Sequence, residues 1–239
     1  MKSRAGLPRR ERRFAGDEPG EAVAGRELET QGGPRYEQLF FEEIAGVVGV
    51  RLMRERDAVV GAELTAPEPL SRGATVSVED AAACLCVAAS HVSSTHHLPQ
   101  VVSVGLPFLT VELTSREALR QSKPNALAHE RVLPPIGTDG VFAYVHGQHA
   151  GELHARMFSP LDATPEDPAT GSATAATIAH LTLLRPERDA ELAWRIEQGR
   201  DMGRPSLILG RTYKRDGVVA AVHVGGHAVP VMRGTLCVD

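Results

Sequence analysis

The sequence predicts an α+β protein, and three observations lead to that class. Short apolar runs broken by turn residues recur along most of the chain, which is typical of strands. Helical segments are few and do not alternate regularly with those runs, as they would in a doubly wound α/β fold. The 239 residues, 42% of them hydrophobic, are enough to bury one core or the cores of two smaller lobes.

Composition and charge favour a small metabolite as partner. The formal net charge of -4 supplies no basic field for nucleic acid or an anionic membrane. No apolar run approaches the roughly 20 residues of a membrane helix. The basic N-terminus lacks the apolar stretch of a signal peptide, so we expect a cytoplasmic protein.

The cysteines predict neither a disulfide framework nor a zinc site. Their number is odd, and Cys84, Cys86 and Cys237 form no C-x-x-C pair. Cys84 and Cys86 lie two positions apart, a spacing that places both on one face of a strand. We expect them to be buried small residues rather than reactive thiols.

The elements follow in order along the chain. Residues 1–26 carry the cluster "RRERR" and no apolar periodicity, which predicts a disordered, solvated tail. "VVGVRLM", the turn "RERD" and "AVVGAELTAP" then predict a β-hairpin over 47–67. "VEDAAACLCVA", residues 78–88, is compatible with a short helix or with a strand.

The rest of the chain reads mainly as strands. "QVVSVGLPFLTVELTS" predicts two strands joined at Gly-Leu-Pro, and Ser115 caps a helix over "SREALRQ". "GVFAYVHG" and "ELHARMFSP" predict two further strands around a polar turn. A last hairpin over 204–226 turns at "KRDG".

One stretch concentrates the chemistry: "FSPLDATPEDPATGSATAATIAHL", residues 158–181. A helix is predicted to begin at about Ser172, with Thr170 or Ser172 as its cap, and Gly171 lets the chain approach a ligand closely. The first turn of a helix presents unpaired N–H groups at the positive end of the macrodipole. This end is therefore a candidate site for an anion, such as the carboxylate of a metabolite.

Two carboxylates precede that helix. Asp167 is the first candidate for acid/base chemistry because it lies next to the predicted anion site, and Glu166 is the second. The alternative is purely structural, since acidic residues near a helix start are common and favourable. The residues alone leave both interpretations open.

The histidines are weak candidates for a metal site. His91, His96 and His97 lie in a predicted loop, and His146 and His149 in a polar turn. No carboxylate or cysteine accompanies them at ligand spacing. The sequence therefore predicts no metal site.

Several segments together resemble the PhzF-like family, named for the phenazine-biosynthesis isomerase. The resemblance is carried by "RMFSP" and "EDPATGSA" within 156–173, "SVGLPFLTVEL" at 103–113, "IEQGRDMGRPSLI" at 196–208 and "VHVGGHAVPVMRGTL" at 222–236. It implies the diaminopimelate-epimerase-like fold, in which each of two lobes is a mixed sheet wrapped around a central helix. It further implies a homodimer and cofactor-independent proton transfer on a small carboxylate-bearing metabolite.

The resemblance also assigns residues. Asp167 and Ser172 occupy the catalytic positions, while Glu166, Thr170 and Gly171 would bind the substrate. It implies neither a metal nor an organic cofactor.

The chain departs from the family pattern in its N-terminal part. The family carries an Asp-x-Phe strand, a Gly-Asn-Pro turn, an acid/base Glu in a "SET" segment and a Gly-His loop, and none of these precedes residue 47. We therefore expect a partial N-terminal lobe at 27–67 and a full C-terminal lobe at 68–239. Two hypotheses follow: an isomerase or epimerase that could be inactive in this form, or a noncatalytic protein that binds a carboxylate metabolite or another subunit.

Overall fold

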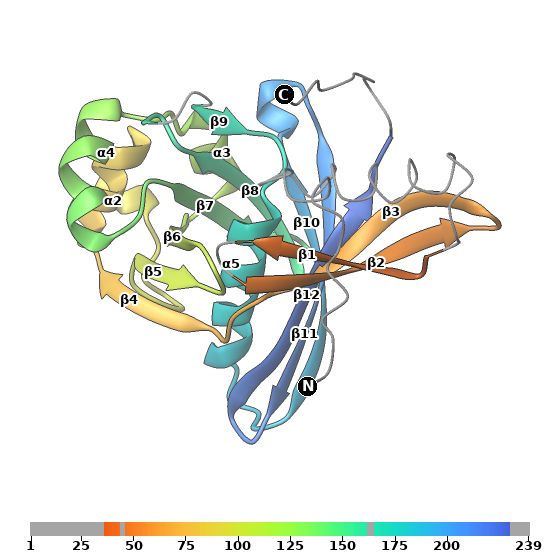
Figure 1. Cartoon of the computed structure of the whole chain (residues 1–239). Coiled ribbons are helices and arrows are strands. Elements are labelled where there is room, and N and C mark those ends of the chain that lie inside the picture. The colour runs from red at the N-terminus through yellow and green to blue at the C-terminus, as the bar shows by residue number, and fades with distance from the viewer. Residues whose placement is uncertain (1–35, 44–45, 162–164, 230–239) are drawn as a thin grey trace, which may run out of the picture. The chain divides into compact units, whose positions relative to one another are not determined.

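The computed structural model describes residues 36–43, 46–161 and 165–229 (Figure 1). They belong to two compact units, one formed by Met1–Leu64 with Gly225–Asp239 and the other by Thr65–Val224. The predicted tail at 1–26 lies outside the described residues. The assignment of 27–67 and 68–239 to two lobes of a family fold stays a prediction.

The first unit is built on antiparallel strands. They are β1 (Gln38–Glu43), β2 (Gly46–Glu55) and β3 (Ala58–Thr65). The turn between β2 and β3 places Arg56 at a φ of 55°, and Glu55 pairs with Ala58 across it. The hairpin predicted from "RERD" is confirmed. Its small core consists of Val48, Val50 and Ala62.

The second unit contains a mixed sheet with the strand order β12-β11-β10-β8-β7-β6-β5-β4, with β9 paired to β8. The strands β6 and β7 are parallel, as are β8 and β10. The bounds in chain order are β4 (Ser71–Thr75), β5 (Gln100–Ser103), β6 (Pro107–Glu112), β7 (Val141–His146), β8 (Glu152–Phe158), β9 (Glu166–Asp167), β10 (Ala190–Gln198), β11 (Ser206–Arg215) and β12 (Val218–His227). The predicted strands are confirmed, whereas β4, β9 and β10 were not predicted.

The helix α5 (Gly171–Leu184) packs against β5, β6, β7, β10 and β11 of this sheet. Nearly all of its residues are buried, as expected of a helix that strands enclose (Figure 1). Two of its threonines are bonded to the strands: Thr177 to Thr110 at 3.1 Å and Thr182 to Thr212 at 2.6 Å between hydroxyl oxygens. The second unit therefore has the predicted diaminopimelate-epimerase-like architecture, a mixed sheet around a central helix.

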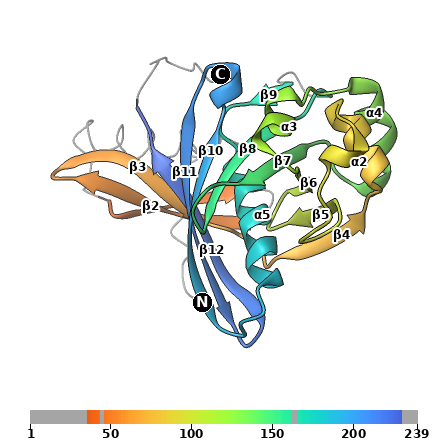
Figure 2. The same ribbon diagram turned by 180° about the vertical axis from the view of Figure 1, so that it is seen from behind.

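Shorter helices cover the other side of β5–β8 from α5 (Figure 2). They are α2 (Val78–Leu85), α3 (Arg116–Gln121) and α4 (Ala126–Val132), with 3-10 turns at Ala89–His91, Pro134–Ile136 and Arg200–Met202. The apolar side chains between these helices and the sheet form the larger core. None of the helices within the described ranges is long and apolar enough to cross a membrane.

The cysteine prediction needs a correction. Residues 78–85 are helical because Ser77 caps them, its hydroxyl accepting the N–H of Asp80 at 3.1 Å. Cys84 is buried in α2, where burial raises the pKa of its thiol to about 11. Cys86 ends the helix at a φ of 53° and is exposed. The two cysteines therefore do not share a strand face.

His180 lies fully buried in the middle of α5. Within the described chain neither of its ring nitrogens has a hydrogen-bond partner. The ring of His97 packs edge-on against it at 4.8 Å between centroids, and Arg72 is a nearby positive charge. Burial, followed by these neighbouring charges, lowers the pKa of His180 from 6.5 to about 4.

This burial makes the stability of the protein depend on pH. Between pH 6.5 and about 4 the unfolded chain binds a proton at His180 that the folded chain does not, so the free energy of unfolding falls as the pH falls through that window. Over the whole window the neutral His180 contributes about 3 kcal/mol to the free energy of unfolding. Urea unfolding at several pH values from 7.5 to ~4.5 measures it. The variant His180→Leu is expected to show a shallower pH dependence, and an unchanged slope would contradict this account.

Candidate functional site

The candidate site lies where the two strands β10 and β9, which both pair with β8, come close to each other. Along one edge β8 pairs in parallel with β10, up to Ala155 opposite Gln198. Two residues further on, the antiparallel β9 takes over, with Met157 opposite Asp167. The end of β10 is thereby brought to β9 and to the turn that leads into α5 (Figure 1).

The side-chain amide of Gln198 holds that turn. Its Oε1 accepts the backbone N–H of Thr170 at 3.1 Å. Its Nε2 donates to the backbone oxygen of Asp167 at 2.7 Å and to the Thr170 hydroxyl at 2.9 Å. Gln198 is almost fully buried, and its two bonds to Thr170 lie away from solvent. The amide orientation is determined, because the reverse orientation would place an NH₂ group against the N–H of Thr170.

The Thr170 hydroxyl has one proton, and the network directs it. Because the hydroxyl oxygen accepts from Gln198, its proton is donated to Oδ2 of Asp167. Thr170 occupies the N-cap position of α5, yet its side chain makes no capping bond. The N–H groups of the first turn, beginning at Gly171, therefore keep their capacity to bind an anion.

The other polar groups of the turn are available to a ligand. Oδ1 of Asp167 has no hydrogen-bond partner among the residues that the structure describes. The same holds for the hydroxyl of Ser172, which is half-buried in the first turn of α5. A carboxylate oxygen, a hydroxyl and helix N–H groups in one turn can hold an anion and exchange a proton with it.

Glu166 faces the opposite way and is bound to Arg156. Both carboxylate oxygens accept from the guanidinium at 2.8 Å. The remaining guanidinium nitrogen donates to the carbonyl oxygens that end α3, those of Leu119, Arg120 and Ser122. This pair of a buried guanidinium and a half-buried carboxylate ties β9 to β8 and to α3. A substrate-binding role for Glu166 stays a prediction.

The loop after β10 supports the turn from the other side. Gly199 follows Gln198 at a φ of 75°. A Cβ atom there would lie 2.2 Å from the carbonyl oxygen of Arg204 and 2.8 Å from that of Pro168, so only glycine fits. The absence of a side chain at this position lets the loop approach Pro168, which lies two residues before the N-cap Thr170.

The structure brings together four of the residues predicted from the sequence: Asp167, Thr170, Gly171 and Ser172. Their roles stay predictions. Sequence reasoning missed Gln198 and Arg156, although both lie in segments that carried the family resemblance. The glycine directly after Gln198 was the local sign of a close backbone approach at this strand end.

Comparisons with known proteins agree on one family. The sequence profile of the PhzC-PhzF family, described as phenazine biosynthesis-like protein, matches residues 8–234. An uncharacterized isomerase of Mesorhizobium japonicum is 33% identical over 91% of this chain and 73% of its own length. A trans-2,3-dihydro-3-hydroxyanthranilate isomerase of Pseudomonas chlororaphis is 29% identical over 83% of this chain and 67% of its own.

A solved structure shows the same fold. The PhzF-family phenazine biosynthesis protein of Bacillus anthracis superposes with a TM-score of 0.72 at 17% sequence identity, covering 88% of this chain and 73% of the other. At this level of identity the likeness concerns the fold. It agrees with the mixed sheet and central helix described above.

The pair of Glu166 and Arg156 makes a stability prediction. Glu166→Gln leaves the buried guanidinium without its counter-charge, which is expected to lower the free energy of unfolding by about 2–4 kcal/mol. Denaturant unfolding measures the change. As a matched control, Glu187→Gln removes the exposed partner of Arg185 and is expected to leave stability unchanged. Equal effects of the two changes would contradict a structural role for Glu166.

Proposed function

Because the chain belongs to the PhzC-PhzF family of phenazine biosynthesis-like proteins, and its relatives are isomerases, we propose that it isomerises a small carboxylate-bearing metabolite by acid/base proton transfer. The reaction would need no cofactor. The assignment of Asp167 as a proton carrier rests on one observation: its carboxylate is held by Thr170 at the uncapped start of α5.

Each group of the turn has a task in this proposal. The first-turn N–H groups of α5 bind the carboxylate of the substrate, and the helix macrodipole favours its charge. The Ser172 hydroxyl donates a further hydrogen bond. Thr170 holds Oδ2 of Asp167, so that Oδ1 is presented to the carbon skeleton.

The proton transfer is balanced within the substrate. Oδ1 of Asp167 takes the proton of a C–H bond next to an unsaturated system, and the electron pair of that bond moves into the conjugated system. The proton is then returned to a different carbon, which leaves the molecular formula unchanged. An unsaturated carboxylate is the substrate class that this step requires, and the Pseudomonas chlororaphis relative is named for such a substrate.

The family resemblance adds a second carboxylate, from a "SET" motif that does not precede residue 47 here. The proposal assigns no residue of this chain to that role. A general base typically raises a rate by about 10²–10⁴-fold, so the rate of hydrogen exchange measures how much of that factor this chain achieves. Homodimer formation and cytoplasmic location also stay predictions.

Exchange of substrate hydrogen with D₂O tests the proposal. Trans-2,3-dihydro-3-hydroxyanthranilate and a panel of small unsaturated carboxylates are incubated with the protein, and deuterium incorporation is followed by mass spectrometry. Asp167→Asn is expected to abolish incorporation and to change the free energy of unfolding by less than about 1 kcal/mol. Asp216→Asn, in the exposed turn between β11 and β12, is the matched control and is expected to exchange normally.

Other results of the exchange experiment would distinguish an isomerase from a noncatalytic carboxylate-binding protein. Incorporation that persists in Asp167→Asn would overturn the role of Asp167. Binding of a carboxylate without any incorporation, unaffected by Asp167→Asn, would instead favour a noncatalytic carboxylate-binding protein.

A further inference from the structure

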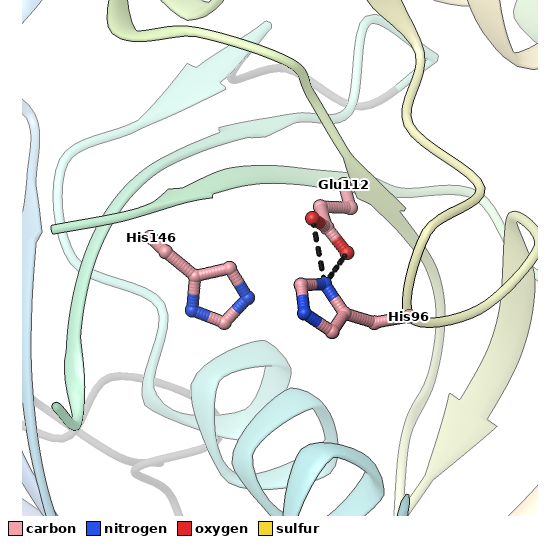
Figure 3. Close-up of side chains that lie close together, drawn as sticks. All are labelled: His96, Glu112 and His146. Carbon is pink, nitrogen blue, oxygen red and sulfur yellow. Dashed lines mark hydrogen bonds and ion pairs between the residues drawn. The ribbon is translucent and has the colours of Figure 1, made fainter.

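A second polar cluster lies at the carboxyl ends of β6 and β7. Glu112 is the last residue of β6 and His146 the last of β7, while His96 comes from the loop before β5 (Figure 3). The two strands are parallel, with Glu112 opposite Tyr144. Because side chains alternate along a strand, Tyr144 and His146 point to the same face. Three segments distant in sequence thereby meet at one edge of the sheet.

The cluster has the donor atoms of a metal site. One potential ligand atom from each of His96, Glu112 and His146 can be chosen so that all lie within 4.8 Å of one another. Two imidazoles and one carboxylate are a common protein ligand set for Zn²⁺, which leaves a further coordination position open. Tetrahedral ligands about 2.1 Å from zinc lie roughly 3.4 Å apart. Both histidines are exposed, so small ring rotations can close the remaining distance.

Glu112 lacks a strong counter-charge. Its side chain is only 7% exposed, and His96 is its one ion-pair partner among the described residues. His96 Nδ1 lies 2.8 and 2.9 Å from the two carboxylate oxygens, but the His96 side chain itself is 52% exposed. A buried carboxylate is costly unless it is paired with a cation and hydrogen-bonded.

The neutral partners of Glu112 compensate only in part. The Ser93 hydroxyl donates to it at 3.3 Å. The Tyr144 hydroxyl lies 3.5 Å from Glu112 but 2.8 Å from Nε2 of His97. His97 donates from Nδ1 to the carbonyl of Leu98 at 2.7 Å, which makes Nε2 the acceptor in a neutral ring. The tyrosine proton is thus directed to His97, and the carboxylate keeps capacity for a cation.

From this geometry we propose that His96, Glu112 and His146 form a Zn²⁺ site. The ion supplies the positive charge that the buried carboxylate lacks, and the Ser93 hydroxyl orients the carboxylate from behind. The site is separate from that of Asp167. His97, the neighbour of His96, contacts His180 of α5, whereas the Asp167 turn lies at Ser172. These two positions of the helix lie about 12 Å apart along its axis. The bound ion would join the loop before β5 to the ends of β6 and β7, and so stabilise the folded chain.

The test uses the full chain after treatment with a chelator. Calorimetric titration with ZnCl₂ is expected to give one site per chain, and His96→Asn and His146→Asn are each expected to weaken binding more than tenfold. Both side chains are exposed, so these variants should fold. His149→Asn, an exposed histidine in the turn after β7, is the matched control and should bind as the wild type does.

Two further readouts identify the ligands. Co²⁺ bound in place of zinc is expected to give the intense visible absorption of a tetrahedral site in the wild type and in His149→Asn, but not in His146→Asn. Zinc is expected to raise the melting temperature of the same two proteins and to leave that of His96→Asn unchanged. Absence of binding to the wild type, or binding unaffected by His96→Asn and His146→Asn, would overturn the proposal.

Discussion

The hydrogen bonds of the Gln198 side chain determine the chemistry available at the start of α5. By accepting the N–H of Thr170, the amide oxygen fixes the orientation of the whole amide, so the NH₂ group must face the Thr170 hydroxyl. That hydroxyl then has its single proton left for Asp167, and in this orientation it makes no capping bond to the helix. One buried side chain therefore accounts for both an oriented carboxylate and an uncapped helix end.

Both polar sites of the second unit follow from its parallel strand pairs. Strands that run in the same direction end at the same edge, so the residues at their carboxyl ends meet without being close in sequence. The pair β8 and β10 brings Gln198 to Asp167, and the pair β6 and β7 brings Glu112 to His146. Because β7 and β8 are antiparallel, the two meeting points lie at opposite edges of the sheet. The buried helix α5 runs between them.

The features predicted correctly from the sequence are those that residues close together in the chain determine. The strands around "QVVSVGLPFLTVEL" and the turn before α5 are defined by neighbouring residues, and the structure agrees with them. The segment of helix α2 was ambiguous because its alanines favour a helix while its β-branched residues favour a strand, and the Ser77 cap decides the outcome. Helix α5 begins at Gly171, one residue before the predicted start, because Thr170 takes the N-cap position.

What the sequence did not predict depended on long-range pairing. Gln198 is 28 residues from Thr170. The apolar periodicity of the sequence does not indicate the parallel pairing of β8 with β10 that brings the two together. A search for metal ligands at short sequence spacing likewise did not find Glu112 as a neighbour of His96. The two lie 16 residues apart in the sequence and come together only in the folded chain. Glu166 was grouped with Asp167 by adjacency, yet alternation along β9 turns it toward Arg156.

The most direct test of the central claim is an NMR titration of the ¹⁵N-labelled protein with anthranilate, observed at the backbone amides of Gly171 and Ser172. The account predicts saturable shifts at these amides in the wild type. It also predicts their loss in folded Gln198→Leu, where the Thr170 hydroxyl is free to cap the helix. Equal shifts in the two proteins, or shifts confined to other parts of the chain, would contradict it.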